Sequence, residues 1–166
     1  YFMDSNLTRR FARIKLVITD VDGVLTDGGM YYTSKGDVMK RFFVRDGMGV
    51  TLLRKKNIPT LIITKENTQM VKQWAKKMKI AKLYDGIIQK ESVLDEICKK
   101  FKVKPEEIAY IGDDINDLGL LKKVGLAAVP NDAIIEAKKI AHYRCKTNSG
   151  YGAFRELADL ILSDKS

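Results

Sequence analysis

Two aspartates separated by one residue, Asp20 and Asp22, directly follow the apolar run IKLVIT at positions 14–19. Alternate residues of an extended chain point the same way, so both carboxylates can face one substrate. One carboxylate can attack a phosphorus atom while its neighbour protonates the leaving oxygen and later activates water. This pair therefore indicates covalent phosphoryl chemistry combined with general acid–base catalysis.

Polar residues also follow two later apolar runs. Thr64 comes directly after the run at 59–63, and Asp113 comes two residues after the run at 108–111. The carboxyl ends of parallel strands form the edge of a sheet at which ligands bind. We therefore expect Thr64 and Asp113 to lie near Asp20.

Carboxylates gathered at such an edge repel one another unless a cation or a proton compensates them. For Asp20, Asp22 and Asp113 we expect a hard divalent cation, because such ions prefer oxygen ligands. Phosphoryl transfer also needs donors and positive charge around the equatorial oxygens. The hydroxyl and backbone N–H of Thr64 and the ammonium of Lys90 could supply these.

The elements that must position these residues alternate along the chain. Apolar runs predict strands at 14–19, 59–63, 83–84, 108–111 and 126–129. Periodicity predicts helices at 46–56 (capped by Asp46), 67–79, 92–101, from about 116, 132–139 and 153–162. A β-hairpin is predicted with strands at 30–33 and 38–44 and a turn at 34–37. This alternation is typical of an α/β domain with a mainly parallel sheet.

The domain organisation follows from the same pattern. Without an internal repeat or a linker, we expect one domain over residues 14–162, preceded by an N-terminal extension at 1–13. Tyr1 and Phe2 precede Met3, the first plausible initiator, so we do not expect them to be native residues.

Composition excludes several functional classes. Among 166 residues, 45% are hydrophobic, and no apolar run reaches the length of a membrane span. The net charge of +9 comes largely from lysines on polar helix faces, without the interleaved aromatics that stack nucleic-acid bases. We therefore expect a small anionic substrate rather than nucleic acid or a membrane. The two cysteines, Cys98 and Cys145, suit a reducing cytoplasm.

The whole set of motifs resembles the haloacid dehalogenase superfamily. The segment DVDGVLTD at 20–27, Thr64, Lys90 and the segment GDDIND at 112–117 are similar to its four motifs, in order. The chain resembles more narrowly the 3-deoxy-D-manno-octulosonate 8-phosphate phosphatases and their relatives that act on nine-carbon, sialic-acid-type sugars. Further similarities are the hairpin region 28–44, the segment RDG at 45–47 and the segment SGYGAFRE at 149–156.

The resemblance implies a role for each aspartate. Asp20 would be the nucleophile and Asp22 the general acid/base. Mg²⁺ would be held by Asp20, by the backbone carbonyl of Asp22 and by Asp113, with Asp114 and Asp117 as neighbouring groups. Asp113 and Asp117 also have an ordinary alternative, since aspartate commonly caps helices.

The resemblance further implies that Thr64, Lys65 and Lys90 hold the phosphoryl group, although Lys90 could instead be a solvated lysine. The fold would be a Rossmann-like three-layer sandwich with a β-hairpin extension and no large cap. The relatives are homotetramers in which hairpins associate and a neighbouring subunit helps to cover the site.

One loop departs from the octulosonate pattern, which carries Thr-Gly-Arg where this chain has Thr64, Lys65 and Glu66. Glutamate-bearing loops occur in relatives that act on nine-carbon 9-phosphates. We therefore expect Glu66 to favour a nine-carbon substrate over an eight-carbon one, with Lys77 as a nearby cation that offsets the charge of Glu66 beside the substrate's carboxylate.

Two further questions stay open in the sequence. For Arg45 and Arg155, the sequence favours neither substrate contact nor ordinary solvation. The alternative to an enzyme is a non-catalytic, tetramerising phosphatase-like module associated with a sugar-nucleotide synthetase.

Overall fold

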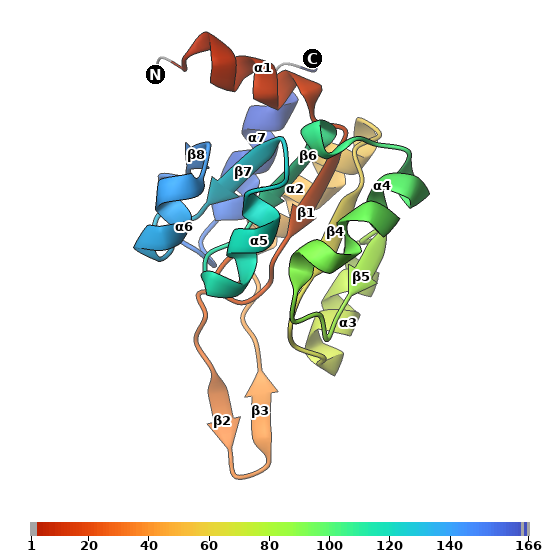
Figure 1. Ribbon diagram of the computed structural model, residues 1–166. Coiled ribbons are helices and arrows are strands. Elements are labelled where there is room, and N and C mark those ends of the chain that lie inside the picture. Colours follow the sequence, from red (N-terminus) through yellow and green to blue (C-terminus); the bar gives the residue numbers. More distant parts are fainter. Residues whose placement is uncertain (1–2, 164, 166) are drawn as a thin grey trace.

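Six parallel strands form the central sheet, in the order β5-β4-β1-β6-β7-β8 (Figure 1). The computed structural model describes residues 3–163 and 165, so the expectation for Tyr1 and Phe2 lies outside the described residues. The strands are β1 (Leu16–Thr19), β4 (Thr60–Ile63), β5 (Lys82–Tyr84), β6 (Ile108–Ile111), β7 (Leu126–Val129) and β8 (Tyr143–Arg144). The expected parallel sheet is confirmed.

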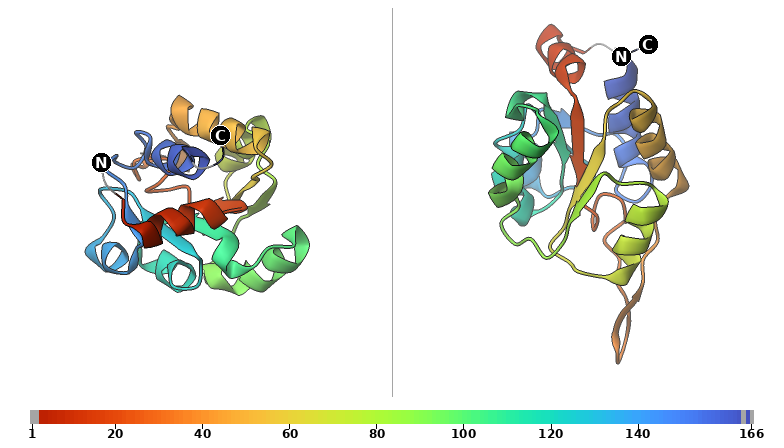
Figure 2. Two further views of the ribbon diagram at one scale, coloured as in Figure 1. Left: turned by 90° about the horizontal axis from the view of Figure 1, so that it is seen from above. Right: turned by 90° about the vertical axis from the view of Figure 1, so that its right-hand side faces the viewer.

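Helices cover both faces of this sheet and make a three-layer sandwich (Figures 1 and 2). The α-helices are α1 (Ser5–Arg13), α2 (Val44–Lys55), α3 (Gln69–Lys77), α4 (Leu94–Phe101), α5 (Leu118–Leu121), α6 (Ile135–Ile140) and α7 (Ala153–Ser163). Short 3₁₀ segments are η1 (Lys90–Val93), η2 (Pro105–Glu107) and η3 (Ile115–Asp117). In the part of the chain that the structure describes, no helix is long and apolar enough to span a bilayer.

The core divides into two layers because successive side chains of a strand point to opposite faces. On β1, Val17 joins the cluster formed with α2, α3 and α7. Leu16 and Ile18 join the cluster formed with α4, α5 and α6. All four residues of β1 are buried, which explains why it is uniformly apolar rather than alternating.

The N-terminal segment contains an element that the sequence analysis did not predict. Helix α1 begins after Asp4, whose side chain accepts a hydrogen bond from the backbone N–H of Leu7. Phe11 is fully buried and packs edge-on against Tyr143. Tyr143 belongs to β8, a strand that the sequence analysis also did not predict. Ile14 ends this helix instead of starting β1, so the first strand is two residues shorter than predicted.

The hairpin projects from the sheet edge (Figure 1), and its return strand differs from the prediction. Strand β2 (Tyr31–Thr33) pairs with β3 (Gly36–Met39), whereas the predicted return strand ran over 38–44. Gly36 has a φ of +109°, a conformation that favours glycine and closes a two-residue turn at 34–35. The chain then enters α2 at Val44.

The other boundaries shift by a few residues. The helix predicted over 92–101 consists of η1 followed by α4, and the one predicted from about 116 consists of η3 followed by α5. The helix predicted from Asp132 begins at Ile135, because both carboxylate oxygens of Asp132 accept hydrogen bonds from Ser149.

The prediction that Asp46 caps α2 is wrong. Asp46 lies inside the first turn of this helix. The side chain is fully buried against α7, where one carboxylate oxygen accepts a hydrogen bond from the backbone N–H of Arg155 at 3.0 Å. It therefore satisfies a free amide in the first turn of α7, not of its own helix. The second oxygen is buried without a hydrogen-bond partner, and burial raises the pKa of Asp46 to about 7.

This buried carboxyl should make stability depend on pH. The folded protein binds a proton at Asp46 below about pH 7, whereas the ordinary pKa of an aspartate is 3.8. The free energy of unfolding should therefore fall as the pH rises between these values, by up to about 4 kcal/mol. Asp46→Asn should remove this component and be more stable than the wild type at pH 8. Urea unfolding at pH 5 and pH 8, with the exposed Asp95→Asn as control, measures it. Parallel pH dependence in wild type and Asp46→Asn would contradict the expectation.

Candidate active site

Three neighbouring strands end at one cleft. Asp20 follows β1, Thr64 follows β4, and Asp113 lies two residues beyond β6. Because β4, β1 and β6 are adjacent and parallel, these residues meet at the carboxyl edge of the sheet, as predicted. The cleft measures about 130 Å³, and its lining residues are Asp20, Asp22, Thr64, Lys65, Glu66, Asp113, Asp114 and Asn116.

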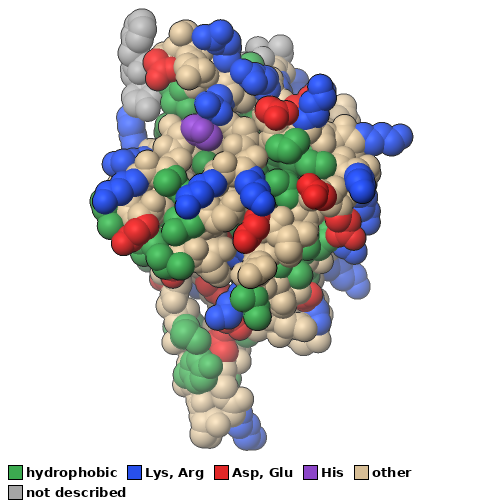
Figure 3. Space-filling view, viewed as in Figure 1, with side chains coloured by type: hydrophobic (Ala, Val, Ile, Leu, Met, Phe, Trp, Pro, Cys, Tyr) green, Lys and Arg blue, Asp and Glu red, His purple; other side chains and the backbone are tan. Residues whose placement is uncertain are grey.

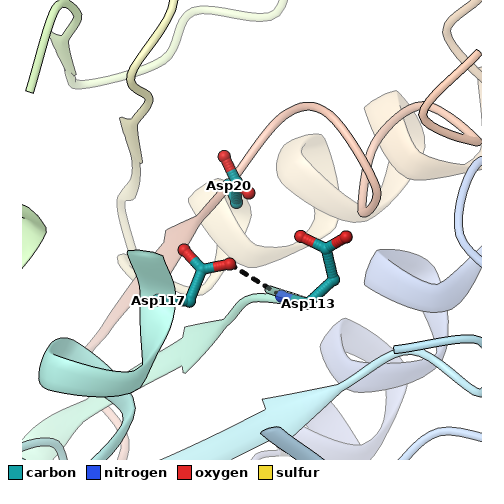
Figure 4. A group of neighbouring side chains, drawn as sticks. All are labelled: Asp20, Asp113 and Asp117. Atoms are coloured by element: carbon teal, nitrogen blue, oxygen red, sulfur yellow. Dashed lines mark hydrogen bonds between the residues drawn. The ribbon is translucent and has the colours of Figure 1, made fainter. Parts of the chain in front are cut away.

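Two carboxylates that line this cleft, those of Asp20 and Asp113, form a cluster with the buried carboxylate of Asp117 (Figure 4). Asp20, Asp113 and Asp117 each offer an oxygen, and the three oxygens lie within 4.8 Å of one another. Burial raises the pKa of Asp20 and of Asp113, and repulsion from neighbouring carboxylates raises both further. Such a set of hard oxygen donors suits a divalent cation, whose charge would relieve the repulsion.

Gly23 allows the backbone to pass close to this cluster. Its φ is +83°, in the left-handed region. A Cβ atom there would collide with the carboxylate of Asp113. The glycine of the DVDG segment is therefore needed both for the turn after Asp22 and for the space that Asp113 occupies.

Asp117 organises the loop after β6. One of its oxygens accepts hydrogen bonds from the backbone N–H groups of Asp113 at 2.8 Å and of Asp114 at 3.1 Å. The other oxygen accepts from the Tyr110 hydroxyl and from Lys90. Burial favours a raised pKa for Asp117, but the charge and hydrogen bond of Lys90 outweigh it and lower the pKa. Asp117 is thus an ionised anchor beneath the cleft.

Lys90 is completely buried between two carboxylates. Its Nζ lies 2.9 Å from Asp20 Oδ1 and 2.7 Å from Asp117 Oδ1, and donates to the Tyr110 hydroxyl at 3.3 Å. Burial lowers its pKa, but the charges of Asp20 and Asp117 raise it above the ordinary value. The solvated alternative for Lys90 is therefore wrong. All three N–H donors have protein partners, and Lys90 does not line the cleft, so the structure links it to Asp20 rather than to the open space.

The loop after β4 places its residues along the cleft. Thr64 is buried, and its hydroxyl accepts a hydrogen bond from the backbone N–H of Glu66 at 3.3 Å. Lys65 and Glu66 are exposed at the rim. Asp114 is also exposed and accepts a hydrogen bond from the adjacent N–H of Ile115, which begins η3.

The remaining candidates lie elsewhere. Lys77 lines a separate groove of about 510 Å³, beside the stacked rings of Phe42 and Trp74. Arg45 and Arg155 line another cavity, of about 730 Å³, and Arg155 forms an ion pair with Asp159 at 2.8 Å. Within this chain the structure does not bring these three residues to the cleft.

Two residues near the cleft were given no role in the sequence analysis. Asn116 lines the cleft, and its position inside the GDDIND segment was the available signal. Lys40 comes from the hairpin and places Nζ 2.9 Å from Asp22 Oδ1 and 3.2 Å from Asp37 Oδ2. Burial lowers the pKa of Lys40, but its bonds to Asp22 and Asp37 outweigh this and raise it. No local pattern marks Lys40, since the pairing depends on the hairpin's path.

Comparison with known proteins gives consistent matches. The sequence model of the haloacid dehalogenase-like hydrolase family matches residues 49–157. The 3-deoxy-D-manno-octulosonate 8-phosphate phosphatase of Haemophilus influenzae is 35% identical over 94% of this chain and 87% of its own length. The corresponding protein of Yersinia pestis is 38% identical over 95% of this chain and 84% of its own length.

Solved structures agree with these matches. The crystal structure of the Yersinia pestis phosphatase superposes with a TM-score of 0.95, at 36% identity, over 98% of this chain and 88% of that one. The Moraxella catarrhalis phosphatase, solved with a magnesium ion, a phosphate ion and a KDO molecule, superposes with a TM-score of 0.93. That match has 32% identity and covers 98% of this chain and 93% of the other.

Proposed function

This chain belongs to the haloacid dehalogenase-like hydrolases and is a magnesium-dependent phosphatase, and we propose that its substrate is a 3-deoxy-ulosonic acid phosphate. The observation that supports the phosphatase chemistry is the pairing of Asp20 with Asp113 at the sheet edge, with Lys90 at 2.9 Å from Asp20. Like charges this close are costly in a buried site, and a bound cation would compensate them. The relatives named above support the substrate class.

The cleft supports a two-step reaction. A carboxylate oxygen of Asp20 forms a bond to phosphorus while the bond from phosphorus to the sugar oxygen breaks, and Asp22 gives its proton to that oxygen. A water molecule then loses a proton to Asp22 and attacks the phosphorus, which releases phosphate and restores Asp20. Thr64 and Lys65 line the space that the phosphoryl group would enter.

Magnesium fits this cluster of carboxylates, and we propose Asp20, Asp113 and the backbone carbonyl of Asp22 as its ligands. When bound, it supplies positive charge beside the phosphoryl oxygens. Asp117 offers an oxygen to the same cluster, but its four hydrogen bonds tie it to Lys90, Tyr110 and the loop backbone.

The eight-carbon octulosonate 8-phosphate is our first candidate, because the relatives named above act on it. This reverses the order expected from the sequence. The nine-carbon 9-phosphates remain the second candidate, because Glu66 lines the cleft where the octulosonate pattern has arginine. A carboxylate there would accept hydrogen bonds from substrate hydroxyls or an amine, whereas an arginine would attract a carboxylate.

Phosphate release from both substrates, with magnesium and with chelator, tests the function. We expect release from the octulosonate to depend on magnesium. The double variant Lys65→Gly/Glu66→Arg, which restores the octulosonate loop, should shift the kcat/KM ratio of the two substrates towards the eight-carbon one. An unchanged kcat/KM ratio would show that Glu66 does not determine the choice between the two substrates. A folded wild type without release from any substrate would favour the non-catalytic module.

We also propose a homotetramer built through the hairpin. Its two strands pair only with each other among the described residues, and such an isolated hairpin is marginally stable. Hydrophobic side chains gather on it (Figure 3). These exposed residues are Met30, Tyr31, Tyr32, Val38 and Met39. An apolar patch of this kind marks an interaction surface.

Light scattering should give the mass of four chains for the wild type. Replacing Tyr32 and Val38 by serine should lower the mass, because both side chains belong to the apolar patch. The exposed Lys35→Ser at the hairpin turn is the matched control. A wild type that stays monomeric at high concentration would refute the assembly.

The two unpaired cysteines agree with a cytoplasmic location, which we also propose.

A further inference from the structure

Lys40 is unusually enclosed for a lysine on a projecting hairpin. Its side chain is 3% exposed, although its neighbours Val38 and Met39 are exposed. Long flexible side chains lose rotamer freedom when they are buried, so this placement is costly unless specific contacts hold it. Those contacts are the carboxylates of Asp22, at the cleft, and Asp37, on β3.

The contacts to Asp22 are all made to one oxygen. Lys40 Nζ donates to Oδ1 at 2.9 Å, and the Thr26 hydroxyl donates to the same Oδ1 at 3.3 Å. The other oxygen, Oδ2, has no hydrogen-bond partner among the described residues. Two donors on one oxygen restrict rotation of the carboxyl group, so Oδ2 remains the oxygen that can exchange a proton in the cleft.

We propose that Lys40 is a positioning residue that holds the Asp22 carboxyl group in its working orientation and thereby couples the hairpin to the proton transfer. Asp37 assists by holding Lys40 from the other side. The proposal rests on the proposed function, because it assigns to Asp22 the proton that the leaving oxygen receives. Lys40 itself touches neither the leaving oxygen nor the phosphorus.

The leaving group of the substrate provides the test. A sugar oxygen needs a proton as it departs, whereas p-nitrophenolate is stable without one. The parameter kcat/KM reports the steps up to the first irreversible one, here the departure of the leaving group. Lys40→Met retains the length of the stem but removes the charge. It should lower kcat/KM for the sugar phosphate by about tenfold or more, and that for p-nitrophenyl phosphate by less than about threefold.

Three further variants complete the design. Lys40→Arg should restore most of the loss on the sugar phosphate, because it returns a cation. Asp37→Asn leaves Lys40 in place and should cause a smaller loss of kcat/KM that is again selective for the sugar phosphate. It replaces Lys40→Met in the test if that variant folds poorly. The control is Lys35→Met, at the exposed turn of the same hairpin, which should change neither substrate.

The outcomes separate this proposal from the function itself. Selective loss on the sugar phosphate with rescue by arginine supports it. Equal losses on both substrates would overturn it and indicate a merely structural or substrate-attracting role, with the phosphatase activity intact. No loss on either substrate would overturn it as well. A wild type that releases phosphate from neither substrate would overturn the proposed function and, with it, the role of Lys40.

Discussion

Asp20→Asn should reduce phosphate release by roughly a thousandfold or more while the protein stays folded. Asparagine has nearly the same shape, but its amide cannot form the covalent bond to phosphorus. Burial and neighbouring carboxylates raise the pKa of Asp20, so the charged form is already disfavoured in the folded protein without metal. The variant should therefore unfold at an equal or higher urea concentration than the wild type in chelator.

Two measurements make the Asp20 result interpretable. Magnesium should raise the urea midpoint of the wild type more than that of Asp20→Asn, because the variant lacks one anionic ligand. The exposed Asp95→Asn provides the control, with unchanged release and unchanged magnesium response. Release by Asp20→Asn at the wild-type rate would exclude Asp20 as the nucleophile.

Lys90→Met should destabilise the protein far more than Asp20→Asn does. It removes the buried cation that lies 2.9 Å from Asp20 and 2.7 Å from Asp117, and so leaves two buried carboxylates without compensation. Breaking a buried ion pair in this way costs about 3–5 kcal/mol. We expect a corresponding fall in the free energy of unfolding and a strong loss of activity, because Asp20 would lose its orientation.

Lys72→Met is the matched control for Lys90→Met. Lys72 pairs with Asp85 at 3.9 Å on the surface, and exposed pairs of this kind contribute at most about 1 kcal/mol. The magnesium dependence should also differ, since bound cation would partly replace the missing charge in Lys90→Met. A Lys90→Met variant as stable as Lys72→Met, with and without magnesium, would show that the buried network does not hold the site together.

The sequence by itself determined the chemistry and most of the sheet. A strand that is buried on both faces must be apolar throughout, so β1, β4, β6 and β7 could be read locally. Because parallel strands share one carboxyl edge, Asp20, Thr64 and Asp113 could be placed together without coordinates. The DVDG and GDDIND segments contain most of the motif residues behind the family resemblance and all the residues that we propose as magnesium ligands.

Only the tertiary structure decided which charges meet. Lys90 and Asp117 are 27 residues apart, and Lys40 and Asp22 are 18 apart. The pattern of neighbouring residues does not encode contacts at such separations, because they depend on how the hairpin lies against the loop after β1 and how η1 lies against η3. For the same reason, the sequence could name Arg45, Lys77 and Arg155 as candidates but could not place them. The structure puts all three beside other cavities.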